Sequence, residues 1–319
     1  MTLGAEKNSK PCVSVIIVTW NALERVRNCL SALFQNSEDV ELEVWLVDNA
    51  SEEPVTEMVR DNFASVNVIQ NKENLGFGTA CNQGIRASKH EVILLLNPDT
   101  EVQKGAIKKM AVYISSHREI GGISPQILDS SGLEHLWFLQ PSVSLWWELL
   151  KETGMINQYV KILSFIEKKY HIRRNHVSFL TGCCLVTRKS LVEKIGMFDE
   201  SFFLYSEDID LSLRIKDAGK KIEFFRDAAV LHHEGQSTSI INYQATLYGK
   251  RAKHRLFIKR GRFVSASIYK VLVYTGLYIR ISLTKLWLQI NREKRKNKRL
   301  LERWKSLNFV LKELKRTWK

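Results

Sequence analysis

The feature that most constrains the fold is an alternation of two hydrophobic patterns along about the first 100 residues. Short apolar runs rich in β-branched residues, typical of buried strands, alternate with longer segments whose apolar residues recur at helical spacing. The runs occupy residues 13–19, 43–48, 66–70 and 91–97, and the helical segments occupy residues 22–36, 54–64 and 79–88. This alternation predicts an α/β fold with a doubly wound, mostly parallel sheet.

The pattern changes in the second third of the chain. Residues 133–170 are rich in Trp, Leu and Lys and are predicted to be helical. Strand character returns at residues 177–186, and a helix at about 207–218 precedes a last strand near residues 228–232. We therefore expect one sheet domain over residues 1–245.

The charge distribution also divides the chain. Residues 250–319 contain 22 Lys or Arg against 3 Asp or Glu, whereas the preceding 249 residues contain 26 basic and 31 acidic residues. This change predicts a basic, amphipathic helical tail over residues 246–319. Residues 263–290 of the tail are apolar, but their longest uncharged run is nine residues. A spanning helix needs ~20, so we expect the tail not to cross a membrane.

Three kinds of partner could bind this tail. An anionic membrane surface would attract its basic residues, while its tryptophans and leucines would enter the interface. Alternatively, the tail helices would pack on the sheet domain or on another subunit of a homo-oligomer. Nucleic acid is the least favoured partner, because the body is acidic and contains no recognisable nucleic-acid module. We expect the membrane surface.

The cysteines and the N-terminus indicate a cellular compartment. Five cysteines without a CxxC pattern fit neither a disulfide framework nor a zinc site. The adjacent Cys183 and Cys184 are expected to be small buried residues in a reduced protein. The apolar run near the N-terminus, six residues at 13–18, is too short for the core of a signal peptide. We expect a cytoplasmic protein, peripheral at the inner face of the cell membrane.

Polar residues follow three of the predicted strands. A strand cannot continue through Pro98, which lacks an N–H group, so Asp99 must lie on a loop. Because the carboxyl ends of parallel strands share one rim of a sheet, these residues should lie on that rim. Each set alone is ordinary turn chemistry, but together they favour a ligand site. The residues are Thr19 and Asn21 after the first strand, Asp48 and Ser51 after the second, and Asn97 and Asp99 after the fourth.

A sugar nucleotide is the ligand that fits this rim best. The chain contains neither a dinucleotide fingerprint after the first strand nor a P-loop. The turn at Gly76 and Gly78, before Asn82, could let a ligand approach the backbone, although such a turn often only redirects the chain. An aspartate can accept a hydrogen bond from a pyrimidine, and a second acid can hold a divalent cation on a diphosphate.

A second group of carboxylates is Glu207, Asp208 and Asp210. Acids in the first turn of a helix stabilise its dipole, but three within four residues exceed what a helix end requires. The functional interpretation is a general base beside a sugar acceptor. Further on, His232 ends a predicted strand, where it is either a core residue or a nitrogen ligand of a metal.

Seven segments in order resemble the family 2 glycosyltransferases of the GT-A fold, especially bacterial rhamnosyltransferase-like members. The resemblance runs from residue 13 to about residue 237. The segments are VSVIIVTWN, VDNAS, NLGFGTACNQG, LLLNPD, TGCCLVTR, FLYSEDIDLSLR and HHEGQS. The sequence departs from the family at Asn97, which stands where the Asp-x-Asp metal motif has its first aspartate.

The resemblance implies a role for each site residue. Asp99, the second acid of the metal motif, and His232 would bind Mn²⁺ or Mg²⁺, with His233 a less favoured ligand. Asp48 would contact the pyrimidine of a dTDP- or UDP-linked sugar. The donor pocket would also include Thr19, Asn21, Ser51, Gly76, Gly78, Asn82 and Asn97. Asp208, paired with Glu207, would be the catalytic base.

The implied reaction inverts the anomeric carbon as a sugar, such as rhamnose, moves to a hydroxyl of a lipid-linked saccharide. Such a reaction belongs to the assembly of cell-surface polysaccharide. The alternative is a catalytically silent sugar-nucleotide-binding or scaffold protein at the membrane, which the neutral Asn97 suggests. The pair Glu207 and Asp208 argues against it, since a scaffold needs no base.

Overall fold

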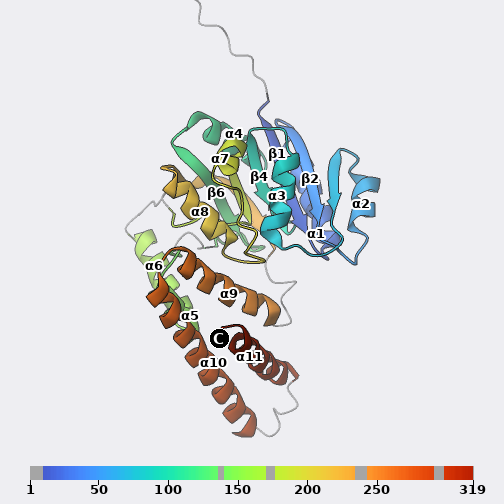
Figure 1. The fold of residues 1–319 in the computed structure, drawn as a ribbon. Helices are drawn as coiled ribbons and strands as arrows, with labels where there is room; N and C mark the ends of the chain where they lie inside the picture. Colours follow the sequence, from blue (N-terminus) through green and yellow to red (C-terminus); the bar gives the residue numbers. More distant parts are fainter. Residues whose placement is uncertain (1–9, 136–139, 170–176, 234–242, 291–297, 319) are drawn as a thin grey trace, which may run out of the picture.

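The computed structural model describes residues 10–135, 140–169, 177–233, 243–290 and 298–318. At its centre is an eight-stranded sheet of order β3-β2-β1-β4-β7-β6-β8-β5, which confirms the predicted α/β fold (Figure 1). The strands are β1 (Cys12–Thr19), β2 (Glu41–Asp48), β3 (Val66–Gln70), β4 (Val92–Leu96), β5 (Thr100–Val102), β6 (Ile120–Leu128), β7 (Cys184–Arg188) and β8 (Lys221–His232).

The sheet has a parallel half and a mixed half. Strands β3, β2, β1 and β4 are parallel to one another. In the other half, β7 is antiparallel to both β4 and β6, β6 is parallel to β8, and β5 is antiparallel to β8. The predicted parallel arrangement therefore describes the first half, while the second half contains the antiparallel strands that sequence periodicity did not reveal.

Strand β6 was missed because Gly121, Gly122 and Pro125 are poor strand formers. The glycines are needed for packing: a Cβ on Gly121 would lie 2.4 Å from the Ile215 side chain. The strand predicted at 177–186 begins only at Cys184, because residues before it form a turn. In that turn, the backbone N–H of Gly182 donates to the side chain of Asp208.

Helices pack on the sheet through apolar faces. In α1 (Leu23–Gln35), the buried residues Val26, Cys29, Leu30 and Leu33 follow helical spacing. The other helices of this unit are α2 (Val55–Asn62), α3 (Phe77–Ala87), α4 (Ala106–Ser116), α7 (Lys189–Lys194) and α8 (Glu207–Asp217). Cys183 and Cys184 are buried and form no disulfide, as predicted, and the same is true of Cys29 and Cys81.

The remaining described helices form a second unit below the sheet in Figure 1. They are α5 (Leu145–Thr153), α6 (Ile156–Lys169), α9 (Tyr243–Lys259), α10 (Phe263–Ile290) and α11 (Lys298–Thr317). Their core is separate from that of the sheet and includes Phe257, Tyr269, Val273 and Leu314. Helix α5 packs on α10, so this unit combines the tail with a segment from the middle of the chain.

The helical unit is also fixed to the sheet unit. Ala252 and Leu256 of α9 pack in one cluster with Phe179, Phe202 and Ile209. Nearby, the Lys259 ammonium lies 2.8 Å from the Asp210 carboxylate, whose side chain is fully buried. The tail thus makes the contacts expected if its helices pack on the sheet domain, which was the second of the three predicted partners.

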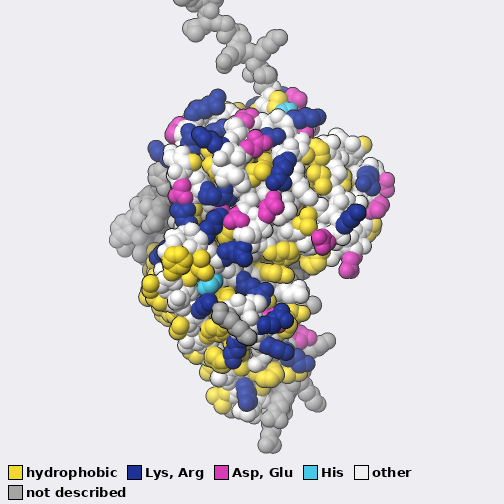
Figure 2. Space-filling view, viewed as in Figure 1, with side chains coloured by type: hydrophobic (Ala, Val, Ile, Leu, Met, Phe, Trp, Pro, Cys, Tyr) yellow, Lys and Arg dark blue, Asp and Glu magenta, His cyan; other side chains and the backbone are white. Residues whose placement is uncertain are grey.

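Helix α10 has two apolar faces. One lies in the core of the helical unit, and the other is exposed at Val264, Val271, Ile279 and Leu283. Among the described helices, residues 263–289 are the one stretch whose length of 27 residues and hydropathy of 1.2 would allow a membrane crossing. The length and composition of α10 thus permit a membrane crossing, whereas the charged residues that interrupt its apolar sequence disfavour one. On the face shown in Figure 2, many hydrophobic side chains, interspersed with Lys and Arg, lie over the helical unit in the lower part of the view.

Candidate active site

Three parallel strand ends lie side by side, as predicted. Thr19 pairs with Asp48 across β1 and β2, and Ile17 pairs with Leu96 across β1 and β4. The residues that follow these strands, 19–21, 48–51 and 97–99, therefore form one edge of the sheet, called here the strand-end rim. The parallel pairing of the strands places polar residues from three separate segments on one surface.

Hydrogen bonds join the first two loops of this rim. The Asp48 carboxylate accepts from the Ser51 hydroxyl at 2.5 Å, and the Ser51 hydroxyl oxygen accepts from the backbone N–H of Asn21 at 2.9 Å. Asp48 is buried, and so is the Thr19 hydroxyl, which makes no hydrogen bond to the described residues. The rim is thus a preformed surface with an unsatisfied polar atom.

Asn49, which sequence analysis did not single out, links this rim to helix α3. Its buried side chain donates to the backbone carbonyl of Gly76 at 3.2 Å. Gly76 has φ +85°, and a Cβ there would lie 2.5 Å from the Phe203 carbonyl oxygen. The glycine is therefore required by close backbone packing. An Asx residue after a strand was the available signal for Asn49, but turn chemistry explains such residues equally well.

Gly78 and Asn82 contact the segment that precedes α8. A Cβ on Gly78 would lie 3.2 Å from Phe198. The buried Asn82 amide donates to the Phe198 carbonyl and accepts from the Phe198 N–H, both at 2.9 Å. These contacts position the 198–206 segment. Whether Gly76, Gly78 and Asn82 also touch a donor stays a prediction.

Asp99 and His232 meet across the β5–β8 pairing. Thr100 is the register partner of His232, which places the preceding residue, Asp99, next to His232. The His232 Nε2 atom lies 3.1 Å from Oδ1 of Asp99, and that oxygen is buried without a hydrogen bond to the described residues. Arg25 lies 3.9 Å from the other oxygen. His233 instead pairs with Glu101 at 2.9 Å.

This pair fits the predicted cation. A buried carboxylate oxygen without a hydrogen bond, facing an imidazole nitrogen, is a donor set that Mn²⁺ or Mg²⁺ accepts. Among the described residues, no group of three or more His, Cys, Asp or Glu could hold a metal. Oxygen atoms of a bound diphosphate or of water would therefore complete the coordination.

The predicted base lies at the start of α8. Tyr205 and Ser206 both have positive φ, +71° and +67°, an uncommon strained conformation for residues other than glycine. Asp208 then accepts from the backbone N–H of Gly182 at 3.1 Å and from that of Ile209 at 2.7 Å. The TGCC and YSED segments are thereby joined around one carboxylate.

Burial controls the protonation of the acid pair. Burial, with the neighbouring Asp208, raises the pKa of Glu207 to about 8. Burial also raises the pKa of Asp208, against the opposing effect of the Gly182 N–H. Glu207 is buried, and its Oε2 atom makes no hydrogen bond to the described residues. Burial thus favours the neutral form of Glu207, while the N–H groups that donate to Asp208 favour its ionised form and oppose the rise of its pKa.

A cavity of about 870 Å³ brings Asn97, His232, Glu207 and Asp208 together. Its other side is formed by α5, α9 and α10, called here the helical wall. The wall residues include Glu148, Lys151, Glu152, Thr246, Lys250, Lys253, Tyr269 and Arg280. Sequence analysis missed all of them as site residues. The charged Arg280 in an apolar segment was the one available signal.

The fold and this cavity together define a class of enzyme, the GT-A glycosyltransferases that use nucleotide sugars. The model of the family "Glycosyl transferase family 2" matches residues 14–196, and this chain belongs to that family. An N-acetylglucosaminyl-diphospho-decaprenol L-rhamnosyltransferase of Mycobacterium tuberculosis is 26% identical over 244 residues, which cover 70% of this chain and 76% of that relative. A low-salt glycan biosynthesis hexosyltransferase of Haloferax volcanii is 27% identical, covering 85% of this chain and 82% of the relative.

Solved structures share the fold. A mannosyltransferase from Pyrobaculum calidifontis in complex with GDP-Man and Mn²⁺ has a TM-score of 0.54 and 12% identity, with coverage of 95% of this chain and 86% of that one. GalNAc-T7 with UDP, GalNAc and Mn²⁺ has a TM-score of 0.55 and 15% identity. There the match covers 77% of this chain and 47% of that chain, about half its length.

Proposed function

We propose that this protein is an inverting glycosyltransferase that moves a sugar from a nucleoside-diphosphate sugar to a hydroxyl group of a lipid-linked saccharide. The observation that carries the proposal is the Asp208 carboxylate, which faces a cavity shared with Asn97 and His232. A base is thus placed beside the strand ends that would hold the donor, as a direct transfer between two substrates requires.

Asp208 accepts the proton of the acceptor hydroxyl as that oxygen bonds to the anomeric carbon. The bond from this carbon to the diphosphate oxygen breaks, and its electron pair leaves with the diphosphate. Attack from the face opposite the leaving group inverts the configuration. The raised pKa of Asp208 brings its basicity closer to neutral pH. Protonated Glu207 contributes no competing negative charge.

The strand-end rim is the proposed donor site. Asp48 would accept from the base of a dTDP- or UDP-linked sugar, and Thr19, with its unsatisfied hydroxyl, would line the pocket with Asn21 and Ser51. Asn97 would bind the donor as a neutral group. Asp99 and His232 would hold Mn²⁺ or Mg²⁺, which when bound would stabilise negative charge on the leaving diphosphate.

The acceptor and the transferred sugar are proposed from the relatives. The Mycobacterium tuberculosis relative is named for rhamnose transfer to a diphospho-decaprenol-linked sugar. This name supports a rhamnose donor and a polyprenyl-diphosphate acceptor for this chain. A silent scaffold is disfavoured, because burying the Glu207 carboxyl group, whose Oε2 atom makes no hydrogen bond to the described residues, costs stability that a scaffold has no reason to give up.

A thermal-shift screen of nucleotide sugars tests the donor site. With Mn²⁺ present, dTDP-rhamnose or UDP-linked sugars should raise the melting temperature, since binding to the folded state alone stabilises it. GDP-mannose should stabilise the protein less, because Asp48 is proposed to accept from a pyrimidine. The proposal fails if no nucleotide sugar stabilises the protein, or if GDP-mannose alone does.

We further propose that the helical unit attaches to the inner membrane surface through α10. Exposed Phe263, Val264 and Leu283 would enter the interface, while the ion pair of Arg280 with Glu152 keeps the middle of α10 against α5. Because that contact would be lost if α10 left the body to span the bilayer, surface attachment is favoured.

Co-sedimentation with vesicles tests this attachment. Vesicles with 30% anionic lipid should bind the protein, and neutral vesicles should bind it less. Raising the salt should weaken binding, because exposed charges are screened beyond about 10 Å at 0.1 M salt. The substitution Val264→Asp should reduce the residual binding at high salt. Equal binding to neutral and anionic vesicles would contradict the electrostatic part.

A further inference from the structure

Four cationic side chains of the helical wall converge on the cavity from three helices. They are Lys151 of α5, Lys250 and Lys253 of α9, and Arg280 of α10, and together they are called the cationic cluster. Lys253 is 6% exposed, and burial lowers its pKa. Burying an ammonium group costs free energy unless nearby anions compensate its charge. Anionic groups must therefore lie close to Lys253.

Two glutamates supply part of this charge. Glu152 lies 2.5 Å from Lys250 and also pairs with Arg280. Glu148 lies 3.7 Å from Lys253 and 3.9 Å from Lys151, both beyond hydrogen-bonding distance. Among the described residues, each glutamate of the wall is therefore shared by two cations. The wall carries four positive charges against two negative ones.

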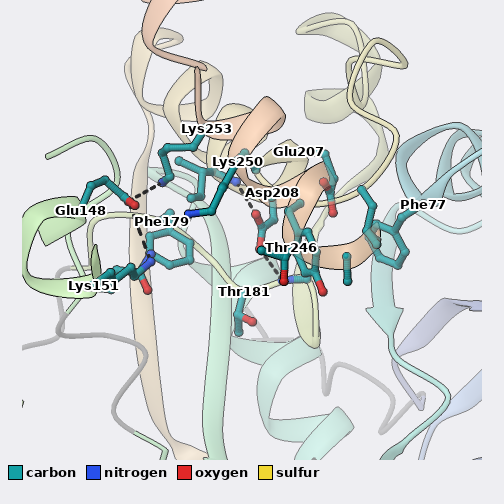
Figure 3. A pocket seen from close by; sticks show the side chains of 18 of the residues that line it. Phe77, Glu148, Lys151, Phe179, Thr181, Glu207, Asp208, Thr246, Lys250 and Lys253 are labelled. Atoms are coloured by element: carbon teal, nitrogen blue, oxygen red, sulfur yellow. Dashed lines mark hydrogen bonds and ion pairs between the residues drawn. The ribbon is translucent and has the colours of Figure 1, made fainter. Parts of the chain in front are cut away.

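The cluster lies on the far side of Asp208 from the nucleotide loops. Figure 3 shows Glu148, Lys151 and Lys253 on one side of the cavity, Asp208 in the middle, and Phe77 on the other side. Phe77 follows Gly76, whose carbonyl is bonded to Asn49 of the strand-end rim. The donor is proposed to bind on that side, so the cationic cluster faces the acceptor.

We propose that the cationic cluster binds the diphosphate of a prenyl-diphosphate-linked acceptor, with the acceptor sugar between this diphosphate and Asp208. This inference rests on the proposed glycosyl transfer and adds the subsite that recognises the lipid carrier. Two glutamates leave part of the charge of the four cations uncompensated, even though Asp208 also interacts with Lys253. A diphosphate diester carries two negative charges, which would balance the remainder. Cations from three helices can contact several phosphate oxygens at once. A ligand with a single carboxylate would not need so many cations.

Apolar side chains also line the cavity that holds the cluster, among them Phe179, Ile209 and Tyr269. A prenyl chain leaving the cluster would pack against these side chains. The outer face of α10 is exposed and apolar at Ile279 and Leu283, and it belongs to the surface proposed to contact the membrane.

The competing explanation is that these ion pairs only hold the tail on the body. That explanation predicts that removing a cation lowers stability without a specific effect on diphosphate binding. A matched control is available in Arg260, which also joins the tail to the body through a bidentate ion pair with Asp217 but does not line the cavity.

Isothermal titration of the full chain with farnesyl diphosphate and with farnesol tests the subsite. Chelator is present throughout, so that a diphosphate cannot bind through a metal at Asp99. Farnesyl diphosphate should bind at least about tenfold more tightly than farnesol. Lys250→Gln and the milder Lys151→Gln should each weaken its binding by about tenfold. Arg260→Gln and Asp99→Ala should bind it as the wild type does.

Three results would overturn the proposal. Equal binding of farnesol and farnesyl diphosphate would show an apolar site only. Loss of binding in Asp99→Ala, with both lysine variants unaffected, would place the diphosphate in the donor site. Equal weakening in Arg260→Gln would show that the cations act through stability. Failure of the proposed transfer would appear elsewhere, as an absence of stabilisation by nucleotide sugars in the thermal-shift screen.

Discussion

The strand-end rim and the helical wall both contribute to one cavity, the rim through Asn97, but they are assembled in different ways. In the rim, Ser51 bonds Asp48 three positions away, and parallel pairing brings the loops together. In the wall, Glu152 is bonded by Lys250 and Arg280, which are 98 and 128 positions away in the chain. Short segments can therefore encode the rim, whereas the wall exists only after the helices have packed. The proposed donor site is therefore readable from sequence, whereas the proposed acceptor site requires the structure.

The largest expected effect lies between the two regions, at Asp208. Asp208→Asn should lower the turnover number by about 10³-fold or more, because the amide cannot accept the proton of the acceptor hydroxyl. Nucleotide binding should remain within about twofold of wild type, since Asp208 faces the acceptor side. Turnover is measured by product formation and nucleotide binding by calorimetry.

The control for Asp208→Asn is Asp217→Asn in the same helix, whose carboxylate pairs with Arg260 outside the cavity. That variant should retain turnover. If Asp208→Asn also turns over at a near wild-type rate, Asp208 is not the base. If it loses nucleotide binding as well, the donor and acceptor sides are not separate.

The next effect concerns the junction between the sheet and the helical unit. Leu256→Ala should lower the free energy of unfolding by about 2–5 kcal/mol, because it leaves a cavity in a packed core. Leu256 is fully buried in the cluster with Phe179 and Phe202. Denaturant unfolding followed by circular dichroism gives this free energy.

Leu301→Ala is the matched control for Leu256→Ala, because Leu301 is 41% exposed on α11. It should change the free energy of unfolding by less than about 0.5 kcal/mol. Equal small losses in both variants would mean that the tail does not stabilise the body. The domain boundary predicted at residue 245 would then also be a boundary in folding.

A smaller effect tests the metal side of the rim. Asp99→Ala should weaken binding of a nucleoside diphosphate by about tenfold in Mn²⁺, equivalent to about 1.4 kcal/mol. In chelator, the variant and the wild type should bind equally. Calorimetry in both media measures the difference. An equal loss in both media would show that Asp99 shapes the loop and binds no cation.

Glu101→Ala is the control for Asp99→Ala. Glu101 pairs with His233 at 2.9 Å at the same end of the β5–β8 pair, so its loss removes a similar acid–histidine contact. Binding should not change in either medium. The substitution Asn97→Asp, which restores the first acid of the metal motif, should strengthen binding in Mn²⁺ only.

The contrast between the rim and the wall also explains which features could be predicted from the sequence. The β1, β2, β3 and β4 strands and the shared rim were predicted, because buried parallel strands are continuous apolar runs. Strand β6 was missed, because glycines that allow close packing also hide strand character. Lys250 and Lys253 were assigned to a membrane-binding tail, because local charge does not reveal that a helix folds back onto a cavity.

The smallest effect per step of the experiment is a pH dependence at Glu207. Its pKa is raised to about 8 in the folded protein, from 4.5 for the free side chain. Between these values, unfolding releases a proton, so the free energy of unfolding falls as the pH rises. The fall should be about 1 kcal/mol per pH unit between pH 6 and 8. Glu207→Gln cannot ionise, and its stability should fall less over the same range. Melting temperatures at each pH measure the difference.

The negative charge of Asp208, the second cause of the raised pKa of Glu207, allows a further test of this pH dependence. Because the charge of Asp208 also raises the pKa of Glu207, Asp208→Asn should move the fall in stability to lower pH. Glu24→Gln, on an exposed side chain of α1, should leave the pH profile unchanged. Parallel profiles for the wild type and Glu207→Gln would show that Glu207 is ionised in the folded protein. The two acids would then share the negative charge, and Asp208 would be a weaker candidate for a single ionised base.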